Sequence, residues 1–262
     1  MRLTPIIGAL ACMGVASAAA AGDLGGSLKD DYSAPAGHNW TGCYLGLHGG
    51  YGWGEWDGHM IYTDAKPNDG FDSSGKTIDL DGGLVGGQAG CNLQLGNFIL
   101  GIEGDIAHSG IDGGKTFLPY PNGSNPPSWT FDLDVNWIAT ARGRIGFSTG
   151  PMLLYLTGGL AWADLESALK VHGDGHNAFG SVSDTKDGWV VGGGFEYAAT
   201  ENWTLKVEYQ YLDFGSFGGI HKGTQFTAPA CKETGCPHTT DGFDGDVTLH
   251  TVRIGANYRF GR

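Results

Sequence analysis

The chain has 262 residues, of which 48 are glycine, and its 15 basic and 28 acidic residues give a formal charge of −13. This acidic balance argues against nucleic-acid binding, because phosphates require a basic face. The 8 Trp, 10 Tyr and 12 Phe are too many for a disordered chain. Glycine shows no collagen-like period, and glycine together with aromatic residues is typical of tightly curved β-sheet.

Residues 1–21 are predicted to be a cleaved signal peptide. Arg2 is followed by a short apolar run and then by the small residues of 16–21. That order fits export and cleavage, and the apolar run is shorter than the about 20 residues that a helical membrane span needs. Residues 22–39 are polar and glycine-rich and are expected to form a flexible periplasmic segment.

After residue 40, strand-like and turn-like stretches alternate to the end of the chain. Leu45 and Leu47 share one face of the first stretch while His48 lies on the other, and this period of two predicts β-strands. The predicted strands are 42–53, 83–95, 98–107, 131–147, 152–163, 188–198, 203–214 and 249–260. Each meets the about 9 to 11 residues that a tilted strand needs to cross a bilayer.

The connections between these strands alternate in length. Three are tight turns, at 96–97, 148–151 and 199–202, and four are long, at 54–82, 108–130, 164–187 and 215–248. Outer-membrane barrels combine tight periplasmic turns with long outer loops in this way, whereas a soluble β-sandwich imposes no such alternation and hides its apolar faces inside. The sequence therefore predicts an all-β fold over residues 40–262, an eight-stranded antiparallel transmembrane β-barrel in a Gram-negative outer membrane.

Six blocks carry a resemblance to a known family. They are Trp40–Gly46, Gly86–Gly90, Gly101–Ile106, Thr157–Ala161, Trp203–Tyr209 and Val252–Phe260. In this order and spacing they resemble the small porin-family outer-membrane proteins of alphaproteobacteria, which are related to opacity-type surface antigens. The resemblance runs from residue 40 to residue 260, outer loops excepted. It implies an eight-stranded outer-membrane barrel that is more structural than enzymatic, although some relatives are reported as haem-binding or as weak pores.

Two features depart from the family pattern. Such proteins tend to end on the aromatic residue that the barrel-assembly machinery reads, whereas Gly261-Arg262 follow Phe260 here. Tyr258 and Phe260 remain the predicted assembly signal. Cys43 and Cys91 replace aromatic residues that relatives usually place on the lipid face.

Charged residues on the inward faces are the strongest chemical feature. Glu103 and Asp105 on one predicted strand face a row of Arg142 and Arg144 on the next. The other inward charges are Glu196, Lys206, Glu208, Arg253 and Arg259. An eight-stranded barrel is barely wide enough for its own side chains, so these charges are expected to interlock as salt bridges. A narrow ion path is the less favoured alternative, because an unpaired charge would be costly and pairing closes the lumen.

Four cysteines are candidates for disulfides, because the periplasm is oxidising. Cys43 and Cys91 share the outward parity of adjacent antiparallel strands, and the register brings them together; free thiols facing lipid are the alternative. Cys231 and Cys236 would close a small ring in the last outer loop. A zinc site is a weaker alternative there, since no further cysteine pair follows.

The remaining chemistry gives no catalytic set, and the chain is predicted not to be an enzyme. His172 and His176, with His221 and His238, could bind haem or a metal, but solvated loop histidines are the favoured interpretation, so no metal and no cofactor is expected. The predicted function is to support the envelope and present surface loops. Outer-membrane lipid, lipopolysaccharide bridged to acidic loops by divalent cations, and the barrel-assembly machinery are the expected partners. A narrow pore for small solutes or a haem receptor is the alternative.

Overall fold

The computed structural model describes residues 38–62, 75–117, 128–173, 176–222 and 240–260. The chain divides into a unit of Met1–Ala34 and a unit of Pro35–Arg262. The predicted signal peptide and almost all of the predicted flexible segment therefore lie outside the described residues, as do Cys231 and Cys236. No helix among the described residues is long and apolar enough to cross a membrane.

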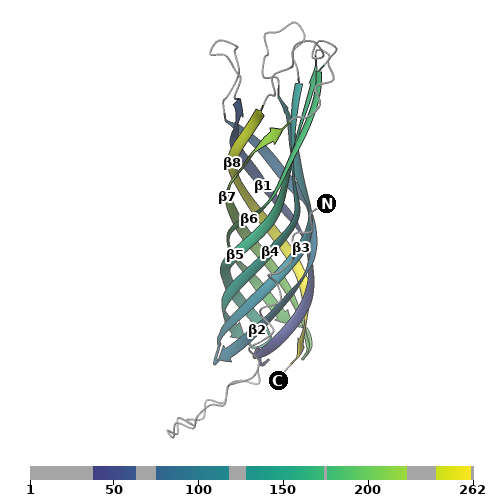
Figure 1. The fold of residues 1–262 in the computed structure, drawn as a ribbon. Helices are drawn as coiled ribbons and strands as arrows, with labels where there is room; N and C mark the ends of the chain where they lie inside the picture. The colour runs from purple at the N-terminus through teal and green to yellow at the C-terminus, as the bar shows by residue number, and fades with distance from the viewer. Residues whose placement is uncertain (1–37, 63–74, 118–127, 174–175, 223–239, 261–262) are drawn as a thin grey trace. The chain divides into compact units, whose positions relative to one another are not determined.

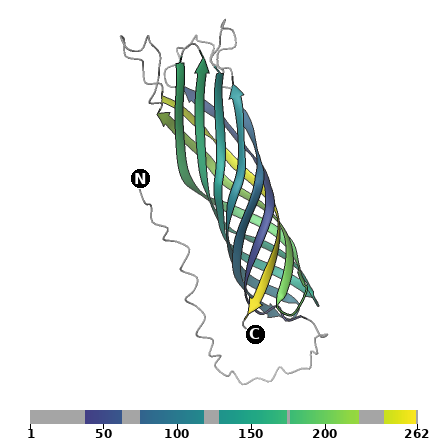
Figure 2. The same ribbon diagram turned by 90° about the vertical axis from the view of Figure 1, so that its right-hand side faces the viewer.

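Eight antiparallel strands close into one barrel in chain order, with β1 hydrogen-bonded to β8 (Figure 1). The strands are β1 (Gly42–Tyr62), β2 (Lys76–Leu95), β3 (Phe98–Phe117), β4 (Ser128–Thr149), β5 (Met152–Gly173), β6 (His176–Ala198), β7 (Trp203–Lys222) and β8 (Thr240–Phe260). A second view shows their common tilt around the barrel (Figure 2). The predicted eight-stranded antiparallel barrel is confirmed.

The strands are longer than predicted. Each has 20 to 23 residues, roughly twice the length that a tilted strand needs to cross a bilayer. The predicted extent of the outer connections is therefore wrong. The predicted loop 164–187 is almost entirely strand, because β5 continues to Gly173 and β6 begins at His176.

Four tryptophans mark a level about midway along the barrel. The aromatic residues Trp53, Trp137, Trp162 and Trp189 pair directly across neighbouring strands with Asp81, Asp164, Asp187 and Asp213. We call the part between the tight turns and this level the turn-side half, which on β1 is Gly42–Trp53. The remainder, which on β1 is Gly54–Tyr62, is the loop-side half.

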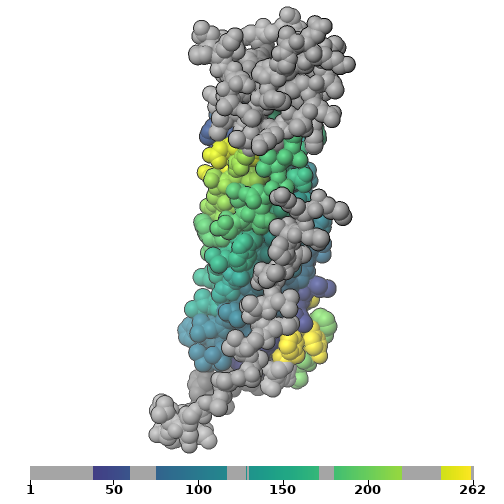
Figure 3. Space-filling model, viewed as in Figure 1, coloured from purple at the N-terminus to yellow at the C-terminus, as the bar shows by residue number. Residues whose placement is uncertain are grey.

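The two halves have opposite polarity. In the turn-side half the outward side chains are apolar and exposed, as in Leu47 (74%) and Ile254 (65%), and the polar and charged side chains, such as Arg142, are buried inside. In the loop-side half the inward side chains are apolar, as in Trp56 and Leu165, both 0% exposed. Side chains on the outer wall close the gaps that the ribbon leaves between strands (Figure 3).

Local irregularities shift the alternation of two strands near this boundary. The register of β4 against β5 shifts between Val135 and Trp137. Unbroken period-two alternation along the predicted strand 131–147 would point Leu133 and Val135 outward with Trp137. This expectation is wrong, because both are buried in the lumen at 0% and 1% exposure. On β7 a similar shift lies between Asp213 and Ser216. A bulge moves all following side chains to the other face, which period-two analysis cannot detect.

A packed lumen as the candidate functional site

All nine predicted lumen charges point into the barrel. Their exposed fractions lie between 1% and 7%. They come from five strands, since strict alternation along each strand sends every second side chain inward. The members are Glu103 and Asp105 on β3, Arg142 and Arg144 on β4, Glu196 on β6, Lys206 and Glu208 on β7, and Arg253 and Arg259 on β8.

Arg142 is the centre of the ion-pair network. Its guanidinium contacts Glu103 at 2.5 Å, Asp105 at 2.9 Å and, across the lumen, Glu208 at 2.9 Å. Glu103 lies directly opposite Arg142 in the register of β3 and β4, as their facing rows predict. The Nε of Arg142 also donates to Thr140, at 2.9 Å. One cation thus holds three carboxylates from two separate parts of the wall.

Three further cations complete the network. Lys206 contacts Glu103 at 2.9 Å, Arg253 contacts Asp105 at 2.7 Å, and Arg144 contacts Glu196 at 2.8 Å. Each pair joins strands that are not neighbours in the sheet. The network therefore crosses the interior of the barrel and ties opposite walls together.

Two tyrosines that the sequence analysis did not single out complete the polar layer. The Tyr44 hydroxyl donates to Glu103 and accepts from Arg144, at 2.7 and 2.9 Å. The Tyr155 hydroxyl donates to Glu208 at 2.7 Å, and its ring centroid lies 3.9 Å from the guanidinium carbon of Arg144. A sequence signal exists for both: each tyrosine lies directly opposite a glycine, Gly90 for Tyr44 and Gly194 for Tyr155, and the ring lies over it.

Trp40 closes the turn-side mouth of the lumen. Its side chain is 0% exposed and packs with Ile99, Leu153, Tyr155 and Ala198. The indole Nε1 donates to the carbonyl oxygen of Gly150, at 3.3 Å. The predicted barrel begins at this residue, but no pattern around it indicated that its side chain lies inside.

Arg259 also lies at this mouth, away from the centre of the ion-pair network. It donates to the carbonyl oxygens of Asn39 and Thr41, and its guanidinium lies 5.5 Å from the Trp40 ring. Asn39 belongs to the predicted flexible segment, so the end of that segment is held against the barrel.

An apolar cluster fills the loop-side half and reaches a short way past the paired tryptophans and aspartates into the turn-side half. It holds 21 buried residues contributed by all eight strands. Aromatic rings form its centre: the Phe131 centroid lies 5.2 Å from that of Trp56 and 5.1 Å from that of Phe243, which lies 5.3 Å from that of Phe217. From the turn side to the loop side, the lumen is thus occupied by the Trp40 cluster, the ion-pair network and this apolar cluster.

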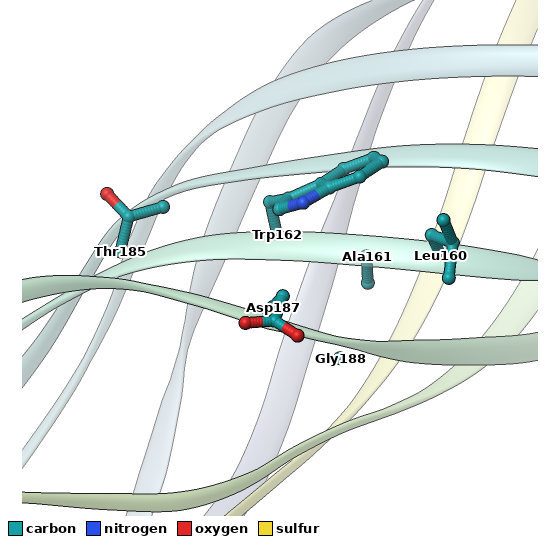
Figure 4. Close-up of a pocket in the computed structure, with 6 residues that line it drawn as sticks. All are labelled: Leu160, Ala161, Trp162, Thr185, Asp187 and Gly188. Atoms are coloured by element: carbon teal, nitrogen blue, oxygen red, sulfur yellow. The ribbon is translucent and has the colours of Figure 1, made fainter. Parts of the chain in front are cut away.

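A shallow groove of about 390 Å³ lies on the outer wall between β5 and β6. Its lining residues are Leu160, Ala161, Trp162, Thr185, Asp187 and Gly188 (Figure 4). Leu160 and Trp162 point outward from β5, next to Asp187 of β6. The groove lies at the level of the paired tryptophans and aspartates.

Carboxylates face one another on the outward side of the loop-side half. The register pairs Asp81 with Asp112, Asp112 with Asp134, and Asp134 with Glu166. Partial burial, and after it the facing carboxylates of Asp112 and Glu166, raise the pKa of Asp134 above its ordinary value. This part of the wall therefore presents a row of like charges to the surroundings.

Cys43, Cys91 and the predicted assembly signal lie near one another on the outward face of the barrel. Cys43 of β1 and Cys91 of β2 are direct register partners and are joined by a disulfide on the outward face. Tyr258 and Phe260 also point outward, from the end of β8. Phe260 lies directly opposite Cys43. A disulfide between Cys231 and Cys236 stays a prediction.

Three of the four candidate haem histidines lie on strands and not in loops as predicted. His172 is the second-to-last residue of β5. His176 is the first residue of β6 and is the register partner of Gly173, the residue after His172. His221 lies on β7. His238 lies outside the described residues. In the described part of the chain, no group of three or more His, Cys, Asp or Glu side chains is arranged to hold a metal ion.

Comparison with known proteins gives consistent results. A family model described as outer membrane protein beta-barrel domain matches residues 7–260. The 31 kDa outer-membrane immunogenic protein of Brucella melitensis is 34% identical over 260 residues, covering 97% of this chain and 98% of the relative. The 22 kDa outer membrane protein of Rhizobium leguminosarum bv. viciae is 32% identical over 182 residues, 70% of this chain and 67% of the relative.

A solved structure supports the same fold. The outer membrane protein OprG from Pseudomonas aeruginosa aligns with a TM-score of 0.50 and 13% identity, covering 87% of this chain and 99% of that one. At that identity the likeness concerns the fold alone.

Proposed function

Because the chain belongs to the outer membrane protein β-barrel family, we propose that it is a sealed structural barrel that supports the outer membrane and carries a rigid acidic extension beyond it. The family and its relatives confirm the predicted location of the chain in the outer membrane. The observation that carries the proposal is the occupation of the lumen by three layers of buried side chains.

The ion-pair network supports a closed barrel more than a channel. Glu103, Asp105 and Glu208 each contact at least one cation within 2.9 Å, and their side chains are at most 2% exposed. A conducting ion would have to separate such pairs and leave buried charges without partners, which is costly. Above the network, a hydrated ion would also have to pass the rings of Trp56, Phe131 and Phe243, which touch one another.

A pore, a haem site in the lumen or an enzyme would need space that these side chains occupy. A narrow pore requires a continuous path through the lumen, and a lumenal haem site requires a cavity wide enough for a planar ring. An enzymatic role would require a substrate to reach the buried carboxylates. A haem receptor at the loop-side surface would need no space in the lumen, so it is the alternative to test by haem titration.

Conductance decides between the sealed barrel and the pore. We expect folded protein, identified by faster gel migration before boiling, to leave a planar bilayer at its baseline current. A large porin inserted under the same conditions serves as the positive control. Reproducible unit openings from the folded protein would overturn the proposal.

The role in envelope support is tested in cells. Deletion of the gene should increase sensitivity to detergent, and the wild-type gene should restore resistance.

The partners stay predictions. Outer-membrane lipid is expected against the outward apolar side chains of the turn-side half. The facing carboxylates Asp112, Asp134 and Glu166 extend the acidic surface expected to meet lipopolysaccharide through divalent cations. Chelator-sensitive co-purification of lipopolysaccharide would test this expectation, and retention in excess chelator would count against it.

A further inference from the structure

The pairing between β1 and β2 is poorly specified by side chains. Seven consecutive register pairs, from Gly46 opposite Gln88 to Gly52 opposite Gly82, each contain at least one glycine. Cross-strand side-chain pairs are what normally fix a register, and glycine-rich strands are prone to slippage. A slip by two residues would keep every side chain on its present face, so the apolar and polar pattern cannot reject it.

The connection between these strands does not fix the register either. β2–β3 and β4–β5 are joined by tight turns at Gly96 (φ 65) and Gly150 (φ 62), and such turns define the pairing of their strands. β1 and β2 are separated by the long connection 63–75. A long connection permits several registers at little difference in cost.

Other hairpins with long connections have specific cross-strand contacts. In β3–β4, Glu103 meets Arg142, and Phe98 lies directly opposite Phe147 with ring centroids 5.6 Å apart. In β7–β8, the rings of Trp203 and Tyr258 are direct partners with centroids 5.3 Å apart.

In the turn-side half of β1–β2 two direct contacts are specific: the Tyr44 ring lies over Gly90, and the disulfide joins Cys43 to Cys91 in the neighbouring register pair and is the covalent one. The hydrogen bonds His48–Gln88 and Tyr51–Asp81 are diagonal to the register. We infer that the Cys43–Cys91 disulfide sets the register of β1 against β2, and that it forms in the periplasm before the barrel closes.

The position of the disulfide determines this order of events. Both cysteines face outward in the turn-side half, where Phe260 of β8 and Ile102 of β3 are their other register partners. Thiol exchange needs the thiolate, and hydrocarbon strongly disfavours a charged group. Cys43 is the second residue of β1, and once β1 pairs with β8 it is flanked by strands on both sides, which restricts the approach of a protein oxidant to its sulfur. The bond must therefore form earlier.

The chemical step is a thiol–disulfide exchange with a periplasmic oxidant that carries a reactive disulfide. One cysteine thiolate attacks the oxidant and forms a mixed disulfide, and the second thiolate then displaces the oxidant as a dithiol. The two cysteines lose two electrons and two protons in total, which the oxidant and the solvent take up. One sulfur–sulfur bond forms in the protein and one breaks in the oxidant.

The central experiment compares three variants for folded protein in the outer membrane, measured by gel mobility with and without boiling. Removing the pair (Cys43→Ser with Cys91→Ser) should lower the folded fraction several-fold. In this double-serine variant, Leu45→Cys with Ala89→Cys moves the disulfide to the next outward register pair. This should restore the wild-type folded fraction, because Leu45 and Ala89 are direct partners. Cys231→Ser with Cys236→Ser is the matched control and should leave it unchanged.

An off-register variant separates register from general stabilisation. Cys43→Ser with Leu45→Cys leaves Cys91 two positions from the true partner of residue 45, too far for a bond without a shift of the strand. Oxidation of this variant should reduce the folded fraction below that of the variant with Cys43→Ser and Cys91→Ser. Equal folding of the two would overturn the role in register.

The timing is tested on the wild-type chain. In a pulse-chase, a thiol-reactive probe that adds mass should find Cys43 and Cys91 oxidised before the heat-modifiable form appears. In cells that lack the periplasmic oxidant with the reactive disulfide, the amount of folded wild-type protein should fall to that of the variant with Cys43→Ser and Cys91→Ser. Heat-modifiable protein with free thiols as the first species, or full assembly of the pair variant and of the oxidant-deficient strain, would overturn the inference.

Refolding of purified protein keeps the inference testable if the variants are degraded in cells. Urea-unfolded wild-type protein with the disulfide intact should fold into lipid vesicles faster than the same protein reduced and alkylated. Equal folding rates would count against the register role.

Discussion

The turn-side and loop-side halves of this barrel use the same eight strands with opposite polarity. In the turn-side half, Leu47 faces outward and Arg142 faces inward; in the loop-side half, Asp134 faces outward and Phe131 faces inward. The first arrangement suits a wall surrounded by lipid, and the second suits a wall surrounded by water. The level of the paired tryptophans and aspartates separates them, as expected of an interfacial girdle.

The difference between the halves shows that different interactions hold the interior together along one barrel. In the turn-side half, buried ion pairs must satisfy one another. In the loop-side half, the hydrophobic effect alone drives the packing of the cluster around Trp56. Variants matched between the halves can therefore test the boundary.

The largest effect is expected from Arg142→Ala in the turn-side half. It leaves Glu103, Asp105 and Glu208 without their shared cation, and breaking a buried ion pair in this way costs about 3 to 5 kcal/mol of unfolding free energy. The measurement is urea unfolding in lipid vesicles, followed by tryptophan fluorescence. Lys170→Ala is the control, because its pair with Asp132 is exposed on the loop-side half and should contribute nothing measurable. Equal effects would show that the network is not a buried unit.

A smaller loss is expected from Leu249→Ala in the loop-side half. Leu249 is 0% exposed within the apolar cluster, and truncation should cost about 3 kcal/mol through lost burial and the cavity that remains. Its chain neighbour Thr248 is half-buried on the other face, so Thr248→Ala should change stability by less than about 0.5 kcal/mol. Similar unfolding curves for both variants would contradict a packed interior at this level.

The position of the lipid boundary is tested by arginine on the outward face. Leu47→Arg places a charge against hydrocarbon in the turn-side half and should cost about 2 kcal/mol. Thr77→Arg, outward on β2 in the loop-side half and directly opposite Asp57, should be neutral or slightly stabilising. The same unfolding assay compares the two, and an equal penalty at Thr77 would place the membrane over the loop-side half as well.

The sequence predicted the turn-side half better than the loop-side half. Leu45 and Leu47 against His48 give a clear period, and tight turns such as that at Gly96 separate the strands. In the loop-side half, the outward side chains are Asp, Ser and Thr, which resemble loop composition when the apolar face is expected outside. The bulge after Val135 added a second error, because it reverses the alternation without any change in composition.

For the site, parity along each strand was enough to place the charges inside, but not to find their partners. The contact of Arg142 with Glu208 crosses the lumen between strands that are not adjacent, and it depends on the tilt and stagger of the closed barrel. Parity also places Tyr44 and Tyr155 inside, but aromatic residues are common on the lipid face, and their contacts with the network depend on the closed barrel.

The smallest expected effect concerns the acidic row on the loop-side surface. Asp134 has a pKa raised above its ordinary value by partial burial and by Asp112 and Glu166. A carboxyl group with a raised pKa in the folded state binds its proton more tightly there than in the unfolded chain, so it lowers stability as pH rises from the ordinary aspartate pKa through the raised value. Asp134→Asn removes this charge.

The variant should therefore stabilise the barrel at neutral pH by a few tenths of a kcal/mol, the scale of like charges facing across strands. The advantage should disappear below the ordinary aspartate pKa, where both states of the wild type are protonated. Midpoints of heat-induced gel-mobility change at pH 7 and pH 3 measure this, with the exposed Asp244→Asn as control. Stabilisation that persists at pH 3 would mean that the introduced amide acts by packing, and the like-charge row would then have no measurable cost in a wall surrounded by water.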